Sequence, residues 1–134
     1  MNAASVDIVD MLEEDSDLGL VFKTNLFVGH TPDKPNNAVT IYDTPSYPPS
    51  LTFDKDERYS YASVQVNVRN VNYEAAFTLG NAIVDSLHGR AHETWNDTFY
   101  AVIYCQTEPA LLEYDNKQRV SLIINFEIQR RKEI

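Results

Sequence analysis

Residues 59–89, YSYASVQVNVRNVNYEAAFTLGNAIVDSLHG, contain the clearest structural pattern in this chain. In the first half, apolar residues alternate with polar ones, and this period of two is typical of a strand with one buried face. After Arg69 the apolar residues recur at spacings of three and four, which is typical of an amphipathic helix. Asn72 suits the N-cap of that helix, Glu74 its first turn, and Gly89 the position just beyond its end. The stretch therefore predicts a strand and a helix that pack together as the centre of an α+β core.

Composition and charge restrict the class of protein. A chain of 134 residues is long enough for one domain with a substantial core, and its charged and apolar fractions are ordinary for a globular protein. The formal net charge of −9 argues against a basic groove that binds nucleic acid. An acidic wall would nevertheless suit a channel through which DNA passes without being held. We find no apolar run long enough for a membrane span and no secretory signal, so we expect a soluble protein made in the cytoplasm.

Further elements are predicted on both sides of residues 59–89. Residues 4–14 have the apolar spacing of a helix, which Asn2 or Ser5 could cap. Alternating apolar and polar residues predict strands at 20–29, 38–43, 98–107 and 119–130. Pro109 should end the third of these strands, after which residues 111–114 either extend the pairing or form a small turn. Residues 90–97 should be a connection, and 115–118 have the composition of a hairpin turn. Together the elements predict an α+β fold, with two helices on one face of a mainly antiparallel sheet of about four to six strands.

Residues 44–57 are predicted to form a long loop, because they contain three prolines and show no clear period. Loops of this length in small domains are usually functional or disordered. Aromatic side chains within the loop favour a role in docking to a partner. The candidate docking residues are Tyr47, Pro48, Pro49 and Phe53.

The polar faces of the predicted strands carry tyrosine, glutamine and asparagine, and two interpretations remain open. An antiparallel sheet commonly leaves one face in water. Tyrosine is also enriched in protein interfaces, because its ring buries a large apolar area while its hydroxyl stays polar. The candidate subunit-interface residues on this face are Tyr59, Tyr61, Gln65, Asn67 and Tyr104.

The sequence offers no motif for catalysis or metal binding. His88 and His92 have the i, i+4 spacing of some zinc sites, but Gly89 lies between them and should end the helix. Cys105 is the single cysteine and falls in an apolar strand, where we expect a buried and inert thiol. Neither a Gly-x-Ser-x-Gly elbow nor a glycine-rich phosphate loop occurs. We therefore predict no enzymatic activity, no metal and no cofactor.

Several short sequences and their order resemble the phage minor capsid and tail terminator proteins, the small head–tail joining proteins of long-tailed phages. The similar sequences are DIVDMLEE at 7–14, TNLFVG at 24–29, VTIYDT at 39–44, VQVNVR at 64–69, YEAA at 73–76, DNKQR at 115–119 and INF at 124–126. They are spread over most of the chain. Residues 44–50 match the family pattern only loosely, so no role is carried over to them.

The resemblance implies a single tail-terminator-like domain over residues 1–134, which assembles as a ring that is six-fold in the family. Such a ring caps the head-proximal end of the tail tube protein, stops tube polymerisation and offers a surface to the head completion protein. DNA passes through the central channel without specific binding, and the protein has no part in a membrane. The ring would lie in the neck of the virion and would assemble in the host cytoplasm. Its role is structural, because no covalent bond is made or broken.

This interpretation assigns two further groups of candidate residues. The basic residues Arg130, Arg131 and Lys132 would contact a neighbouring ring, as would residues 47–57 of the loop. The candidate channel-lining acids are Asp15, Asp17, Asp54, Asp56 and Glu57. Three alternatives remain open. They are a head completion protein one layer nearer the portal, a monomeric ligand-binding module with a pocket at Tyr61, Gln65 and Tyr104, and a hydrolase with an unrecognised site.

Overall fold

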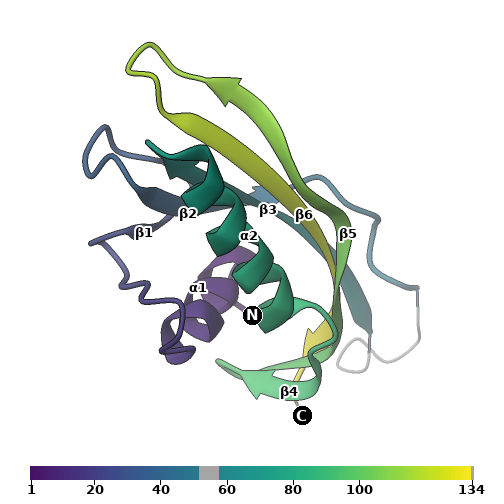
Figure 1. Ribbon diagram of the computed structural model, residues 1–134. Helices are drawn as coiled ribbons and strands as arrows, with labels where there is room; N and C mark the ends of the chain where they lie inside the picture. Colours follow the sequence, from purple (N-terminus) through teal and green to yellow (C-terminus); the bar gives the residue numbers. More distant parts are fainter. Residues whose placement is uncertain (52–57, 134) are drawn as a thin grey trace.

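The protein is described by a computed structural model of residues 1–51 and 58–133 (Figure 1). Within these residues lie α1 (Ala4–Glu14), β1 (Leu26–Val28), β2 (Ala38–Thr44), β3 (Tyr59–Asn70), α2 (Tyr73–Leu87), β4 (Ala91–Trp95), β5 (Thr98–Tyr114) and β6 (Val120–Lys132). The strands form one sheet in the order β1-β2-β3-β6-β5-β4. β1 and β2 are parallel, and every other neighbouring pair is antiparallel. The predicted α+β fold with a mainly antiparallel sheet is confirmed.

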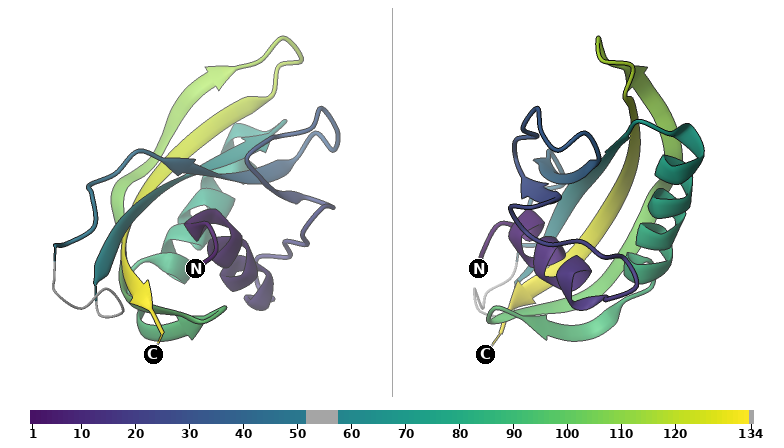
Figure 2. Two further views of the ribbon diagram at one scale, coloured as in Figure 1. Left: turned by 180° about the vertical axis from the view of Figure 1, so that it is seen from behind. Right: turned by 60° about the vertical axis from the view of Figure 1, so that its left-hand side comes forward.

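Both helices cover the same face of the twisted sheet, as Figures 1 and 2 show. The helix-facing side chains of the strands include Val66 of β3 and Ile124 of β6, and both are fully buried. The helices contribute Ile8, Met11 and Leu12 from α1 and Ala76, Ile83 and Leu87 from α2. The strand and helix predicted from residues 59–89 therefore form the centre of the core, as their two periods indicated.

The structure corrects three of the predicted elements. β1 is shorter than the predicted strand at 20–29, and the predicted connection at 90–97 contains β4 (Ala91–Trp95). β5 (Thr98–Tyr114) continues through Pro109 instead of ending before it. The pairing of β5 with β6 has four register shifts, and Pro109 lies in the shift between Thr107 and Ala110. A proline is tolerated at such an irregularity because the ladder there does not need its missing N–H.

Helix α2 packs close to this irregular part of β5. A side chain added at Gly80 would place its Cβ 3.2 Å from Cγ of Pro109 and 3.6 Å from Cδ1 of Ile124. Pro109 is itself buried beneath the helix. The absence of a side chain at Gly80 therefore allows the close approach of α2 to the sheet.

The two helices are capped in different ways. Asn72 caps α2 as predicted, because its side chain accepts the N–H of Ala75 at 3.0 Å. Neither Asn2 nor Ser5 caps α1. Instead Asp43 of β2 accepts the backbone N–H of Ser5 at 3.1 Å and the hydroxyl of Ser5 at 2.6 Å. A carboxylate from a distant strand thus satisfies the start of α1, where the helix dipole favours an anion.

Candidate assembly surfaces

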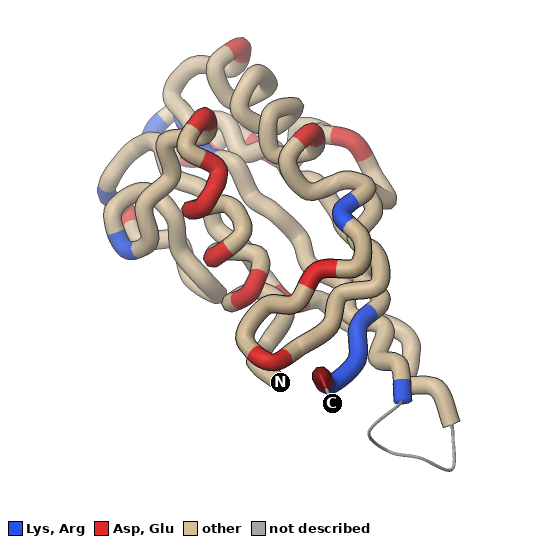
Figure 3. The backbone as a smooth tube through the Cα atoms, turned by 90° about the horizontal axis from the view of Figure 1, so that it is seen from below, with Lys and Arg blue, Asp and Glu red and all other residues tan. Residues whose placement is uncertain are grey.

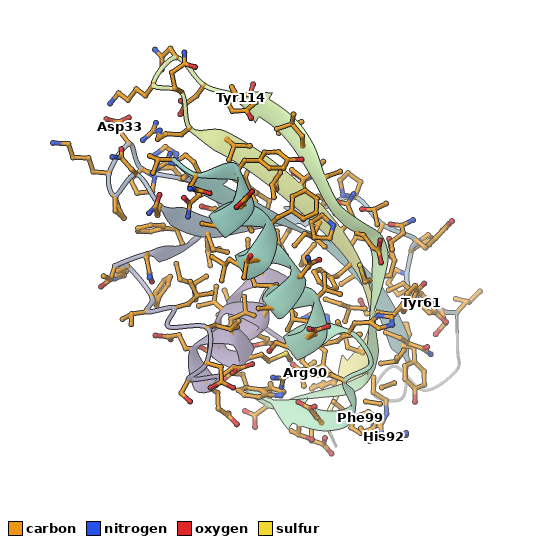
Figure 4. All side chains as sticks on the ribbon, in the orientation of Figure 1. Asp33, Tyr61, Arg90, His92, Phe99 and Tyr114 are labelled. Atoms are coloured by element: carbon orange, nitrogen blue, oxygen red, sulfur yellow. The ribbon has the colours of Figure 1, made fainter. Side chains whose placement is uncertain are left out.

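The histidines and the cysteine singled out in the sequence contact other groups within the described residues. Among residues 1–51 and 58–133, no group of three or more His, Cys, Asp and Glu could hold a metal ion. The imidazole Nδ1 of His88 accepts the N–H of Cys105 at 2.8 Å, whereas His92 lies beside the ring of Phe99 (Figure 4). Burial raises the pKa of the Cys105 thiol and the charge of Glu108 adds to this effect, so the thiol stays protonated. In the same described residues, no helix is long and apolar enough to cross a membrane.

The sheet face opposite the helices carries the predicted interface residues. On β3 the residues Tyr59, Tyr61, Gln65 and Asn67 share this face, because they alternate with the valines that point into the core. Tyr104 of β5 lies in the same register row as Ser63, since both are opposite Glu127 of β6. The structure therefore brings the five residues onto one face of the sheet. Whether a second subunit covers them stays a prediction.

Side-chain hydrogen bonds connect the strands across the middle of this face. The hydroxyl of Ser63 donates to Glu127 at 2.7 Å. The amide of Gln65 donates to Asn125 at 3.3 Å, and Asn125 in turn donates to the hydroxyl of Thr107 at 3.0 Å. These bonds run from β3 through β6 to β5 and fix the side chains in place. The face is thus an ordered polar surface that a partner could contact without rearranging it.

One end of this face is covered by residues 29–37, which connect the parallel strands β1 and β2. The guanidinium of Arg69 is buried and donates to the carbonyl oxygens of Pro32 at 2.7 Å, Pro35 at 2.7 Å and Asn36 at 3.2 Å. Burial lowers the pKa of Arg69, and the charge of Arg119 lowers it further. Arg69 therefore holds a backbone segment whose carbonyl groups would otherwise need water.

Arg119 ties the same segment to the turn between β5 and β6. Its Nη1 donates to the carbonyl oxygen of Asp33 at 2.6 Å, and its Nε donates to the carboxylate of Asp115 at 2.7 Å. Hydrogen bonds from Arg119 hold the pKa of Asp115 below its ordinary value, and the hydrogen bond from Lys117 does the same for Asp33. Figure 4 shows Asp33 beside this turn. The end of the β5–β6 hairpin is thus anchored to residues 29–37.

The hairpin projects beyond the start of α2 (Figure 1), and we call residues 110–123 the hairpin arm. On its β6 side, Val120 and Leu122 are buried. On its β5 side, Leu111, Leu112 and Tyr114 are 47%, 52% and 55% exposed, and we call these three residues the arm patch. Three half-exposed apolar residues within four positions form a patch, unlike the single exposed apolar residues that are normal on protein surfaces. The sequence analysis missed this patch.

A buried polar cluster lies at the other end of the sheet. Asp7 of α1 is fully buried and accepts hydrogen bonds from the hydroxyl of Tyr100 and from Asn96 at 2.6 Å. Arg130 reaches the same cluster, with Nη1 3.9 Å from the Asp7 carboxylate and 2.8 Å from the carbonyl oxygen of Asn2. Burial raises the pKa of Tyr100, and the hydrogen bond to Asp7 adds to the rise. The cluster joins α1 to β5 and β6.

The three predicted basic contact residues are therefore in different environments. They lie within β6 (Val120–Lys132), where alternation turns Arg130 toward the helices and buries it. Arg131 lies on the other face, 4.8 Å from the ring centroid of Phe99, and Lys132 is exposed near the end of the strand. Arg130 is engaged inside the subunit, so only Arg131 and Lys132 remain candidates for contact with a partner.

The candidate docking loop is described in part. Tyr47, Pro48 and Pro49 are exposed, while Phe53 lies outside the described residues. A cavity of about 490 Å³ separates this segment from the start of α1 and is lined by residues that include Tyr47, Tyr61 and Arg130. Gln65 and Tyr104 do not line that cavity, so it is not the pocket that the monomeric binding module required.

The candidate channel acids are also described in part. Asp15 and Asp17 lie in the turn after α1, where Asp15 accepts the N–H of Asp17 at 3.2 Å. Figure 3 shows this acidic turn on a different side of the molecule from the basic end of β6. Asp54, Asp56 and Glu57 lie outside the described residues.

Comparison with known proteins gives a family match and a structural match. Residues 8–132 match the family model described as bacteriophage tail terminator protein. A chain in a solved structure titled as the virion of a native gene transfer agent particle has a TM-score of 0.67, with 14% sequence identity. The alignment covers 96% of this chain and 95% of that chain, so the two share a fold. No curated protein matches the chain significantly.

Proposed function

This chain belongs to the bacteriophage tail terminator family, and we propose that it acts as a homo-oligomeric ring that caps the tail tube and joins it to the head. The coarser role follows from the family, namely that of a structural tail protein of the virion. The family match over residues 8–132 carries the proposal. The ordered polar sheet face and the arm patch support it, because both are surfaces on which a second subunit could pack.

The surfaces described above can be assigned roles in such a ring. Tyr61 and its neighbours on the polar sheet face would lie between subunits, while Tyr47 and Arg131 would contact the tail tube protein or the head completion protein. Asp15 and Asp17 would line the channel, where negative charge repels DNA and prevents it from binding to the wall. In this proposal the ring sits in the neck of the virion, contains about six copies and assembles in the host cytoplasm.

The proposal is tested by native mass spectrometry over a concentration series, with and without the tail tube protein. We expect a ring of about six copies, either alone or when tubes are present. Electron microscopy of the same mixtures should show that the protein limits the length of growing tubes. A subunit that stays monomeric at every concentration and leaves tube length unchanged would refute the ring.

The same experiment separates the terminator from the alternatives. A ring that binds portal-bearing heads but does not bind tubes would indicate a head completion protein. A stable monomer that binds a small molecule or peptide would indicate a ligand-binding module.

A further inference from the structure

We propose that the arm patch of one subunit packs against the β1 edge of the next copy of this chain, so that subunits join head to tail. The β1 edge is defined here as Val21, Phe22 and Lys23, which precede β1 (Leu26–Val28) at one edge of the sheet. This inference rests on the ring proposed above, and it names the two surfaces that meet. Its evidence is an uncovered apolar strand, a matching patch of opposite charge, and the positions of both in the sheet.

The β5 side of the hairpin arm is apolar over several consecutive residues. Pro109-Ala110-Leu111-Leu112 is a continuous apolar run, in which register shifts between Thr107 and Ala110 and between Leu111 and Glu113 interrupt the alternation of faces. In register, Leu111 lies opposite Leu122 and Tyr114 lies opposite Val120. Those β6 partners are buried, but Leu111 and Tyr114 stay half exposed because the arm projects past α2 (Figures 1 and 4). Among residues 1–51 and 58–133, no group fully covers the side chains of the arm patch.

The arm is held rigidly enough to act as a preformed contact surface. Arg119 connects the turn of the hairpin to the backbone of residues 29–37, and Lys117 pairs with Asp33 in the same segment. Both anchors lie on the side of the arm away from Leu111. A partner that covers the arm patch therefore loses little conformational entropy in ordering it.

The β1 edge matches the arm patch in polarity and is opposite in charge. Val21 and Phe22 are 51% and 40% exposed, and the Lys23 ammonium lies 5.7 Å from the Phe22 ring centroid. Within residues 18–32, Lys23 is the one formally charged residue; within residues 104–114, the charged residues are Glu108 and Glu113. In register Glu113 lies opposite Ser121, on the sheet face away from Leu111 and Tyr114, so attraction between Lys23 and Glu113 acts only at the rim of an apolar contact.

One acid of α1 also faces the β1 edge. The carboxylate of Glu13 accepts the backbone N–H of Phe22 at 2.9 Å. This carboxylate is engaged in holding the turn that presents Val21 and Phe22. The charge of Glu13 offsets part of the positive charge of Lys23. We therefore expect the apolar side chains to contribute more of the binding free energy than Lys23 does.

The positions of the two patches determine the kind of assembly. β4 pairs only with the Thr98–Val102 part of β5, so along the hairpin arm β5 forms the edge of the sheet opposite the β1 edge. Contact between two different patches is head to tail and can close into a ring, whereas contact of a patch with itself stops at a dimer. β1 is short and β5 is irregular, so neither edge is suited to continuing the sheet through backbone hydrogen bonds. The contact is therefore made by side chains.

Two complementary variants test this contact. Leu111→Asp/Leu112→Asp removes the arm patch and leaves the β1 edge intact, while Phe22→Asp does the reverse. Val6→Asp is the matched control, because Val6 is an exposed apolar residue of α1 outside both patches. Size-exclusion chromatography with light scattering and native mass spectrometry are carried out on each variant and on an equimolar mixture of the first two. Tail tube protein is included if the wild type needs it to form rings.

We expect each patch variant to raise the concentration needed for ring formation by on the order of 30-fold or more. The control should assemble like the wild type. The mixture should form a one-to-one heterodimer that does not grow, because one intact patch remains on each partner. Thermal unfolding by circular dichroism confirms that the variants are folded. Glu113→Lys and Lys23→Glu form a second, milder pair, in which mixing should partly restore assembly.

Rings from either patch variant at wild-type concentrations would overturn the contact and leave the proposed function intact. So would homodimers of one variant, or a mixture that stays monomeric. A wild type that forms no ring even with tubes would overturn both the contact and the proposed function.

Discussion

Replacing Arg69 by methionine should destabilise the subunit by about 2–3 kcal/mol and release residues 29–37 from the sheet. The guanidinium donates to three backbone carbonyl groups within 3.2 Å, and hydrogen bonds to a charged group contribute about 1.5–3 kcal/mol each in favourable cases. We do not expect the contributions of the three hydrogen bonds to add up in full. Burial lowers the pKa of Arg69, so the folded protein disfavours the charge at this site, and methionine removes that cost while keeping most of the apolar side chain.

Arg131→Met is the matched control, because it makes the same substitution on the same face of the sheet, the face opposite the helices. Arg131 lies near the ring of Phe99, and such a contact at an exposed site is worth about 0.5–1 kcal/mol. Urea denaturation, monitored by circular dichroism, gives the free energy of unfolding of each of the two variants. Hydrogen–deuterium exchange over residues 29–37 should rise in the Arg69 variant alone. If the two variants lose equal stability, Arg69 does not hold the segment as we describe.

Three further predictions concern the core, the buried cluster and the channel. Gly80→Val should lower the free energy of unfolding by about 1–3 kcal/mol, because the new side chain meets Pro109 at 3.2 Å; thermal denaturation measures it, and an unchanged melting temperature would show that α2 can move. Tyr100 has a raised pKa in the folded state, so it contributes stability that is fully present below its ordinary pKa of about 10 and is lost as pH rises further. Tyr100→Phe should therefore be less stable than the wild type at pH 8 and should lose less additional stability above pH 10, as urea denaturation at several pH values would reveal; parallel curves would contradict this. Asp15→Lys/Asp17→Lys should leave ring assembly intact and slow the ejection of DNA from assembled virions, and an unchanged ejection rate would remove these two acids from the channel wall.

Local sequence patterns predicted the parts of the fold that depend on neighbouring residues. The alternation before Arg69 and the helical spacing after it each lie within one element, and Asn72 caps a helix three residues away. The bounds of α1 were predicted correctly, but its cap was not, because the acceptor at its start, Asp43, comes from another strand. β4 was missed because a short exposed edge strand such as Ala91–Trp95 has little apolar pattern.

The candidate site could be predicted only in part, for related reasons. Strand alternation placed Tyr61 and Gln65 on one face, and the same alternation in β6 would have placed Arg130 on the buried face had it been extended to the end of the strand. The roles of Arg69 and Arg119 depend on residues 29–37 folding across the sheet, which no local pattern reveals. The run of apolar residues after Pro109 was the available signal for the arm patch.

The C-terminal strand lies in the middle of the sheet, and this has a consequence for synthesis of the protein. β6 pairs with β3 on one side and β5 on the other, so both of these strands lack their shared partner until residues 120–132 have been translated. Arg130 also closes the buried cluster with Asp7, near the other end of the chain. A nascent or prematurely terminated chain therefore cannot complete its core, and because a domain folds as a unit, such a fragment presents neither a finished arm nor a finished sheet face. The arm and the polar sheet face therefore take their final form only after β6 has been synthesised.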